Sequence, residues 1–210
     1  MNIYDERPKQ SPKKETQVVQ DDSPYIILNE ILANQLEFDD SVVYLNDDID
    51  NHTLFDLMIR VRRILKFRES KDFKGQLNDP INLMINSAGG CIHEMMGLID
   101  YIGSLNVKVN TICRGKAFSA AAVILTCGTG TRMISRNSTI MFHQASSMIQ
   151  GKLTDVTATV DFVKQVESGI YNILAGKTKH DSAWWNNSMR SDLYLTADKA
   201  LELGVVDQII

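Results

Sequence analysis

The hydrophobic positions of this chain follow two spacings that alternate along the sequence. Short segments with the pattern of strands occur at 25–28, 42–45, 81–86, 107–113, 132–134, 139–142 and 205–210, and those at 25–28 and 42–45 are apolar runs. Apolar residues recur at helical spacing over about 54–66, 92–102, 118–127, 153–175, 182–189 and 196–204. Strands that alternate with helices predict an α/β protein, in which 81–86, the helix after it and 107–113 form a βαβ unit.

One junction between a strand and a helix carries a serine. Residues 114–117 predict a short turn after the strand 107–113, and Ser119 lies in the first turn of the helix that begins near Phe118. A hydroxyl there is surrounded by unpaired N–H groups at the positive end of the helix dipole, where it is well placed to attack a carbonyl. On this stretch alone, an ordinary capping serine is the simpler interpretation.

A pair of glycines follows the strand 81–86. Ser87 and Ala88 lead into Gly89 and Gly90. Paired glycines at a strand end let the backbone approach a ligand and expose N–H groups, although a plain tight turn explains them as well. Their spacing matches neither a phosphate-binding loop nor a dinucleotide fingerprint.

Two further polar residues stand next to predicted elements. His143 directly follows the strand 139–142, and Asp192 precedes the helix 196–204. A lone histidine is most often a hydrogen-bonded structural residue, so its place after a buried strand makes it only a candidate.

The outer faces of two helices are predicted to be solvated. The helix 153–175 has a valine-rich stripe for packing within the domain or between subunits, and its other face is expected to be exposed at Asp155, Asp161, Lys164 and Glu167. Basic residues on the helix 54–66 are interpreted in the same way, and 67–80 is predicted to be a polar loop.

Composition narrows the possible functions. The 210 residues suffice for one core, and a formal net charge of −4 disfavours nucleic acid as a main partner. Three cysteines without a C-x-x-C pair indicate neither a disulfide framework nor a zinc site; Cys91, Cys113 and Cys127 are expected to be buried apolar thiols in the cytoplasm. No apolar run approaches the roughly 20 residues that cross a bilayer. No metal and no cofactor are predicted.

Domain organisation follows from the same patterns. Residues 1–23 are polar and charged and are expected to be a flexible N-terminal segment, and 24–210 are expected to form a single domain.

Five short motifs occur in one order along the chain. They are Asn86–Gly90, Gly115–Ala120, Met141–Gln144, Gln150–Asp155 and Asp192–Ala197. In this order, the chain from about Val42 to Ile210 resembles the ClpP family of serine peptidases. By this resemblance Ser119 is the nucleophile, His143 the general base and Asp192 the carboxylate that orients the imidazole. The backbone N–H groups of Gly90 and Ala120 would form the oxyanion hole.

The resemblance also implies an architecture and partners. The fold would be a ClpP/crotonase-like spiral of βαβ units with a protruding strand-and-helix handle at about 144–176. Subunits would form stacked heptameric rings, a tetradecamer around a chamber, in which unfolded polypeptides or peptides are hydrolysed without ATP after delivery by an AAA+ unfoldase.

Some positions depart from the family pattern. Ala88 and Ala145 stand where the family usually has proline, and Phe118 is bulkier than the usual alanine. These changes reshape the substrate groove without removing a catalytic group. Two alternatives stay open: a ring subunit with weak catalysis, and a crotonase-like acyl-CoA enzyme, which shares the fold and the oxyanion hole but needs no triad.

Overall fold

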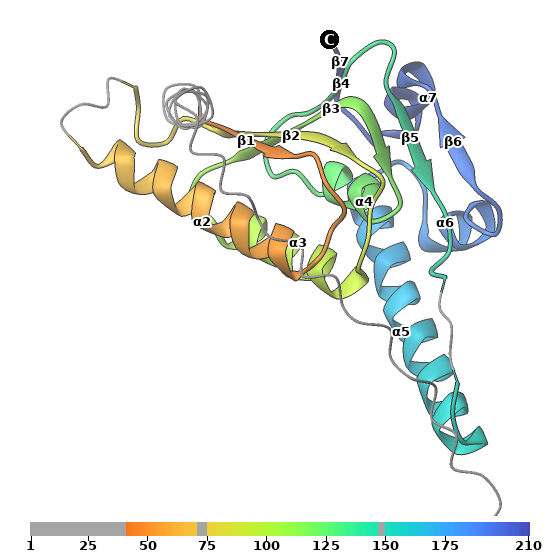
Figure 1. Cartoon of the computed structure of the whole chain (residues 1–210). Coiled ribbons are helices and arrows are strands. Elements are labelled where there is room, and N and C mark those ends of the chain that lie inside the picture. Colours follow the sequence, from red (N-terminus) through yellow and green to blue (C-terminus); the bar gives the residue numbers. More distant parts are fainter. Residues whose placement is uncertain (1–40, 71–74, 147–149) are drawn as a thin grey trace, which may run out of the picture. The chain divides into compact units, whose positions relative to one another are not determined.

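The central sheet consists of strands whose alternate side chains are buried. Strands β1 (Val42–Leu45), β2 (Ile81–Ser87) and β3 (Val109–Phe118) lie side by side and run parallel (Figure 1). Every second residue of β2 is buried, which is the period of a pleated strand. The strands predicted at 42–45 and 81–86 are therefore confirmed.

The computed structural model describes residues 41–70, 75–146 and 150–210. All of them belong to one compact unit, Gln35–Ile210. The predicted flexible segment 1–23, the domain start at 24 and the strand at 25–28 lie outside the described residues and stay predictions. None of the helices in the described ranges has the length and apolarity to cross a membrane.

The turn predicted at 114–117 is wrong, because β3 continues through these residues to Phe118. Gly115 has a φ of 100°, a conformation that a residue with a Cβ rarely adopts. On either side of this glycine β3 pairs with a different parallel neighbour: 111–113 with β4 (Arg132–Ile134) and 116–118 with β5 (Thr139–Phe142). Gly115, which suggested a turn, therefore forms a bend within a continuous strand.

The remaining strands complete the sheet. β5 pairs antiparallel with β6 (Leu193–Leu195), and β4 pairs parallel with β7 (Gln208–Ile209), so the order is β1-β2-β3-β4-β7 with β5 and β6 branching from β3. The last strand is shorter than the predicted 205–210, because Val205 and Val206 donate their N–H groups to the carbonyl of Ala200. The predicted α/β class is confirmed.

Helices cover the sheet. Helices α2 (Asn51–Arg68) and α3 (Ile92–Ser104) lie next to each other along β1 and β2, and α4 (Ala120–Thr126) packs against β3 (Figure 1). Helix α5 (Leu153–Lys177) extends away from the sheet and is followed by α6 (Ser182–Ser188) and α7 (Ala197–Leu203) (Figure 1). As predicted, α7 is capped by Thr196 and ends at Gly204, which has a φ of 77°.

A tryptophan fixes the strand that leads to His143. Trp185 is fully buried, its ring lies edge-on to Phe142 at 4.9 Å between centroids, and its Nε1–H donates to Thr178 Oγ1 at 2.8 Å. Phe142 is the last residue of β5. The contact therefore holds the end of β5 against α6, one residue before the histidine.

Candidate active site

Ser119 occupies a sharp turn between β3 and α4. Its φ of 54° is unusual for a residue with a side chain, and such backbone conformations cost on the order of 1–3 kcal/mol. Its N–H donates to the carbonyl of Met141 in β5 at 2.7 Å. Ser119 stands at the N-cap position of α4, but its side chain makes no capping hydrogen bond. The simpler interpretation as a capping serine is thus not what the geometry shows.

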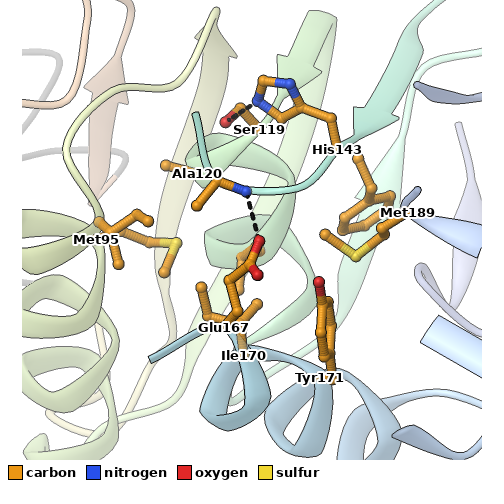
Figure 2. A pocket seen from close by; sticks show the side chains of 12 residues that line it. Met95, Ser119, Ala120, His143, Glu167, Ile170, Tyr171 and Met189 are labelled. Atoms are coloured by element: carbon orange, nitrogen blue, oxygen red, sulfur yellow. Dashed lines mark hydrogen bonds between the residues drawn. The ribbon is translucent and has the colours of Figure 1, made fainter. Parts of the chain in front are cut away.

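The hydroxyl of Ser119 instead meets His143. Ser119 Oγ lies 2.7 Å from His143 Nε2, within hydrogen-bond distance (Figure 2). The two residues come together because 116–118 of β3 pair with 139–141 of β5, so both strands end at the same edge. Two bonds hold the chain after the histidine: Gln144 N–H donates to Met189 O at 3.2 Å, and Ala145 N–H donates to Glu167 Oε1 at 2.7 Å.

Asp192 lies on the other side of the imidazole. Its Oδ1 is 3.9 Å from His143 Nδ1, which is an ion-pair distance but beyond a direct hydrogen bond. The antiparallel partners Phe142 and Leu193 place these two neighbouring residues opposite each other. The Asp192 side chain is about half exposed, at 53%. Its position is set by the β5–β6 pairing, together with a long hydrogen bond that Tyr194 Oη donates to Asp192 Oδ2 at 3.5 Å.

The paired glycines pack directly against the serine. A Cβ on Gly89 would lie 2.8 Å from Ser119 Cβ and 3.0 Å from the amide nitrogen of Ala120. Ile49 holds the pair through two backbone hydrogen bonds, from its N–H to Gly89 O and from Cys91 N–H to its carbonyl. Within the described ranges, the N–H groups of Gly90 and Ala120 donate no hydrogen bond. Two free amide donors thus flank the junction that carries the hydroxyl.

A pocket opens beside Ser119 and His143. Its walls are mostly apolar and come from Ile92, Met95, Ala120, Val123, Phe142, Ala145, Ile170 and Met189. Glu167 and Tyr171 of α5 complete the wall, and Figure 2 shows both side chains pointing toward the side where Ser119 and His143 lie.

The prediction that Glu167 is exposed is therefore wrong. Its side chain is partly buried and is bound to the backbone of Ala145. The sequence does contain a signal for the partial burial of Glu167. It lies three residues before Ile170 and four before Tyr171, on the same face of the helix as these two buried residues.

The three cysteines are not equivalent. Cys113 and Cys127 are buried as predicted, whereas Cys91 is exposed because it lies at the start of α3, outside the core. In the part of the chain that the structure describes, no group of three or more histidine, cysteine or acidic side chains could hold a metal ion.

We expect iodoacetamide to modify Cys91 alone in the folded protein at about pH 8. Burial raises the pKa of Cys113 to about 12 and that of Cys127 to about 11, so both remain protonated thiols. Mass spectrometry of peptides from the folded protein checks this, with protein unfolded in urea as the control in which all three react. Equal modification of Cys91 and Cys113 in the folded protein would contradict it.

Comparisons with known proteins agree with one another. The model of the Clp protease family matches residues 35–210. Proteins named ATP-dependent Clp protease proteolytic subunit from Bacteroides thetaiotaomicron and Bacteroides fragilis are each 29% identical over 198 residues, which cover 90% of this chain and 85% and 90% of those proteins. ATP-dependent Clp protease proteolytic subunit 1 from Mycolicibacterium paratuberculosis is 28% identical over 176 residues, covering 82% of this chain and 80% of that protein.

Proposed function

Because this chain belongs to the Clp protease family, as the five motifs predicted, we propose that it is a serine peptidase subunit with Ser119 as its nucleophile. The observation that carries the proposal is the 2.7 Å distance between Ser119 Oγ and His143 Nε2. A serine–histidine pair at hydrogen-bond distance is the arrangement that activates a hydroxyl for attack. The neighbouring free amides of Gly90 and Ala120 supply the second requirement, which is a site for the oxyanion.

The geometry supports a two-step acyl transfer. The Ser119 hydroxyl donates its proton to His143 Nε2 as Oγ bonds to the peptide carbonyl carbon, and the carbonyl oxygen becomes an oxyanion that accepts from the Gly90 and Ala120 amides. His143 then gives the proton to the leaving amine as the C–N bond breaks. Water repeats the sequence on the acyl-enzyme, which frees Ser119 and releases the carboxylic acid.

Asp192 has the orienting role in this proposal. Closing the gap of 3.9 Å to hydrogen-bond distance requires a shift of the exposed carboxylate by about 1 Å. The carboxylate would then accept the Nδ1 proton of His143, which keeps Nε2 free to act as the base.

We expect Asp192→Asn to lower kcat/KM for peptide hydrolysis by about 10²–10⁴-fold, because an amide cannot stabilise the imidazolium and favours the wrong tautomer. Asp198→Asn is the matched control: Asp198 is exposed and pairs with Arg136 at the surface, so its loss is expected to change the rate less than about twofold. Steady-state rates for one fluorogenic peptide compare the two. An unchanged rate in Asp192→Asn would assign the orienting role elsewhere.

The proposal extends to substrates and assembly. The family relation supports unfolded polypeptides or peptides as substrates, an assembly of stacked rings around a chamber, and delivery by an ATP-driven unfoldase in the cytoplasm. The subunit itself would hydrolyse peptides without ATP. Analytical ultracentrifugation of the full chain tests the ring, and peptide hydrolysis with and without ATP tests the energy requirement.

Reaction with a fluorophosphonate tests the central claim, because such probes label only an activated serine. Labelling of the assembled protein at Ser119 is expected, and its absence would contradict the peptidase proposal. The gap between His143 and Asp192 favours one alternative, a ring subunit whose catalysis is weak in the isolated chain. A crotonase-like acyl-CoA enzyme would have no need for the Ser119–His143 contact.

A further inference from the structure

The pocket beside Ser119 contains two polar groups that the proposed mechanism does not use. Glu167 and Tyr171 stand one helical turn apart on α5, and both line the pocket together with Met95 and Met189. In Figure 2 the carboxylate of Glu167 and the hydroxyl of Tyr171 both point into the space between these walls. An apolar pocket with a few convergent polar groups is the usual form of a specific binding site.

The Glu167 carboxylate is only partly satisfied. Its Oε1 accepts the N–H of Ala145 at 2.7 Å, and in the described part of the chain no lysine, arginine or histidine forms an ion pair with it. A partly buried carboxylate with an open oxygen gains free energy from a cationic donor, because removal from water weakened its hydration.

The Tyr171 hydroxyl is unsatisfied as well. Tyr171 is only 7% exposed, and among residues 41–70, 75–146 and 150–210 its hydroxyl is buried without a hydrogen bond of standard geometry. Burial raises the pKa of Tyr171, the nearby Gln144 side chain lowers it in part, and the charge and hydrogen-bonding of the nearby Glu167 carboxylate raise it further. Buried polar groups in proteins almost always have a partner, so this hydroxyl, which points into the pocket beside the Glu167 carboxylate, is available to a ligand that enters it.

On the premise of the peptidase function above, we propose that Glu167 and Tyr171 make this pocket selective for a lysine side chain of the substrate, on the acyl side of the cleaved bond. The pocket begins at Ser119, so the side chain next to the attacked carbonyl enters it. The aliphatic stem of lysine packs against the flexible methionine walls, which adapt to its width. Its ammonium donates to the open oxygen of Glu167 and to the Tyr171 hydroxyl oxygen.

An apolar side chain with the same four-carbon stem is disfavoured. Norleucine would fill the stem region equally well but would leave the carboxylate and the hydroxyl desolvated and without partners. Sites built to bind a polar group reject the analogue that lacks it far more strongly than apolar sites reject a missing methylene. The pair lysine and norleucine therefore isolates the contribution of the two polar groups.

The test compares two fluorogenic peptides that differ only by lysine or norleucine before the cleaved bond. The wild-type chain is expected to show a kcat/KM for lysine about 10–100-fold above that for norleucine. Glu167→Gln keeps an oxygen for Ala145 N–H but removes the charge, so the ratio is expected to fall to about threefold or less. Asp161→Asn removes an exposed charge from the same helix and should leave the ratio as in the wild type. The ratio does not depend on how much protein is folded.

A second measurement keeps this inference separate from the peptidase proposal. In Ser119→Ala, calorimetry compares the affinity for product-like peptides that end in lysine or norleucine, and about tenfold tighter binding of the lysine peptide is expected. Equal or weaker binding of lysine, or equal rates in the wild type, would overturn the lysine pocket. If lysine binds more tightly but the wild type neither hydrolyses peptides nor reacts with a fluorophosphonate, only the peptidase proposal fails.

Discussion

Replacement of Ser119 by alanine is expected to lower kcat/KM for peptide hydrolysis by at least about 10⁴-fold and to abolish labelling by a fluorophosphonate. Alanine has no atom that can attack the carbonyl, and Ser119 Oγ lies 2.7 Å from His143 Nε2, the proposed base. The fold should persist, because alanine keeps the Cβ and Ser119 holds β5 through its backbone N–H. A change in Tm of less than about 4 °C is expected, which corresponds to the loss of one hydrogen bond.

A double variant shows whether serine and histidine act as a unit. His143→Ala is expected to lose about as much activity as Ser119→Ala, and the double variant should lose little more, since residues that act together are not additive. Initial rates and mass spectrometry of the labelled peptide give both readouts. If labelling persisted in Ser119→Ala, the nucleophile would be a different residue and the mechanism above would be wrong.

Gly90→Ala is expected to lower kcat/KM by about 10²–10³-fold, even though it alters no side chain that reacts. Gly90 has a φ of 153°, and an added Cβ would collide with the carbonyl oxygen of Ile49 and lie 2.6 Å from its nitrogen. Both are backbone atoms of a bridged pair and cannot turn aside. The loop must therefore shift, which moves the Gly90 N–H away from the proposed oxyanion position.

Gly103→Ala is the matched control for this change. Gly103 lies in α3, and a Cβ there would meet nothing within 4 Å. Alanine in place of a helical glycine is expected to stabilise the fold by about 0.5–1 kcal/mol and to leave the rate within twofold. Circular dichroism melting and peptide kinetics on both variants separate a catalytic defect from unfolding. A Gly90→Ala variant that is folded and retains full activity would remove Gly90 from the oxyanion hole.

Local sequence patterns predicted most elements of this fold, but they failed where the pairing between strands determines the structure. The short strands predicted at 132–134 and 139–142 matched β4 and β5, since in each a few apolar residues are bounded by polar or glycine residues. The end of β3 was missed because Gly115 is read locally as a turn signal, whereas β5 supplies a partner strand for the residues beyond it. The place of Glu167 was predicted wrongly because a charged residue is usually exposed to solvent. In the structure its carboxylate accepts a hydrogen bond from the backbone N–H of Ala145.

In the candidate site, too, the residues could be predicted from the sequence but their distances could not. Residue types and motif order proposed Ser119, His143 and Asp192, and the structure brings the first two into hydrogen-bond distance and the third to 3.9 Å. Their catalytic roles stay predictions. The distances could not be derived from the chain itself, because they depend on the register of β5 against β3 and β6.

Periodicity, capping and motif order are properties of neighbouring residues or of their order in the chain. They were enough to predict the alternation of strands and helices, the ends of α7 and the family. Two features of the site became apparent only in the folded chain: the Ser119 hydroxyl meets His143 instead of capping its helix, and the acidic side chain of Glu167 lines the adjoining pocket. These features arise from contacts between segments far apart in the chain, and such contacts depend on strand register and packing rather than on local preference.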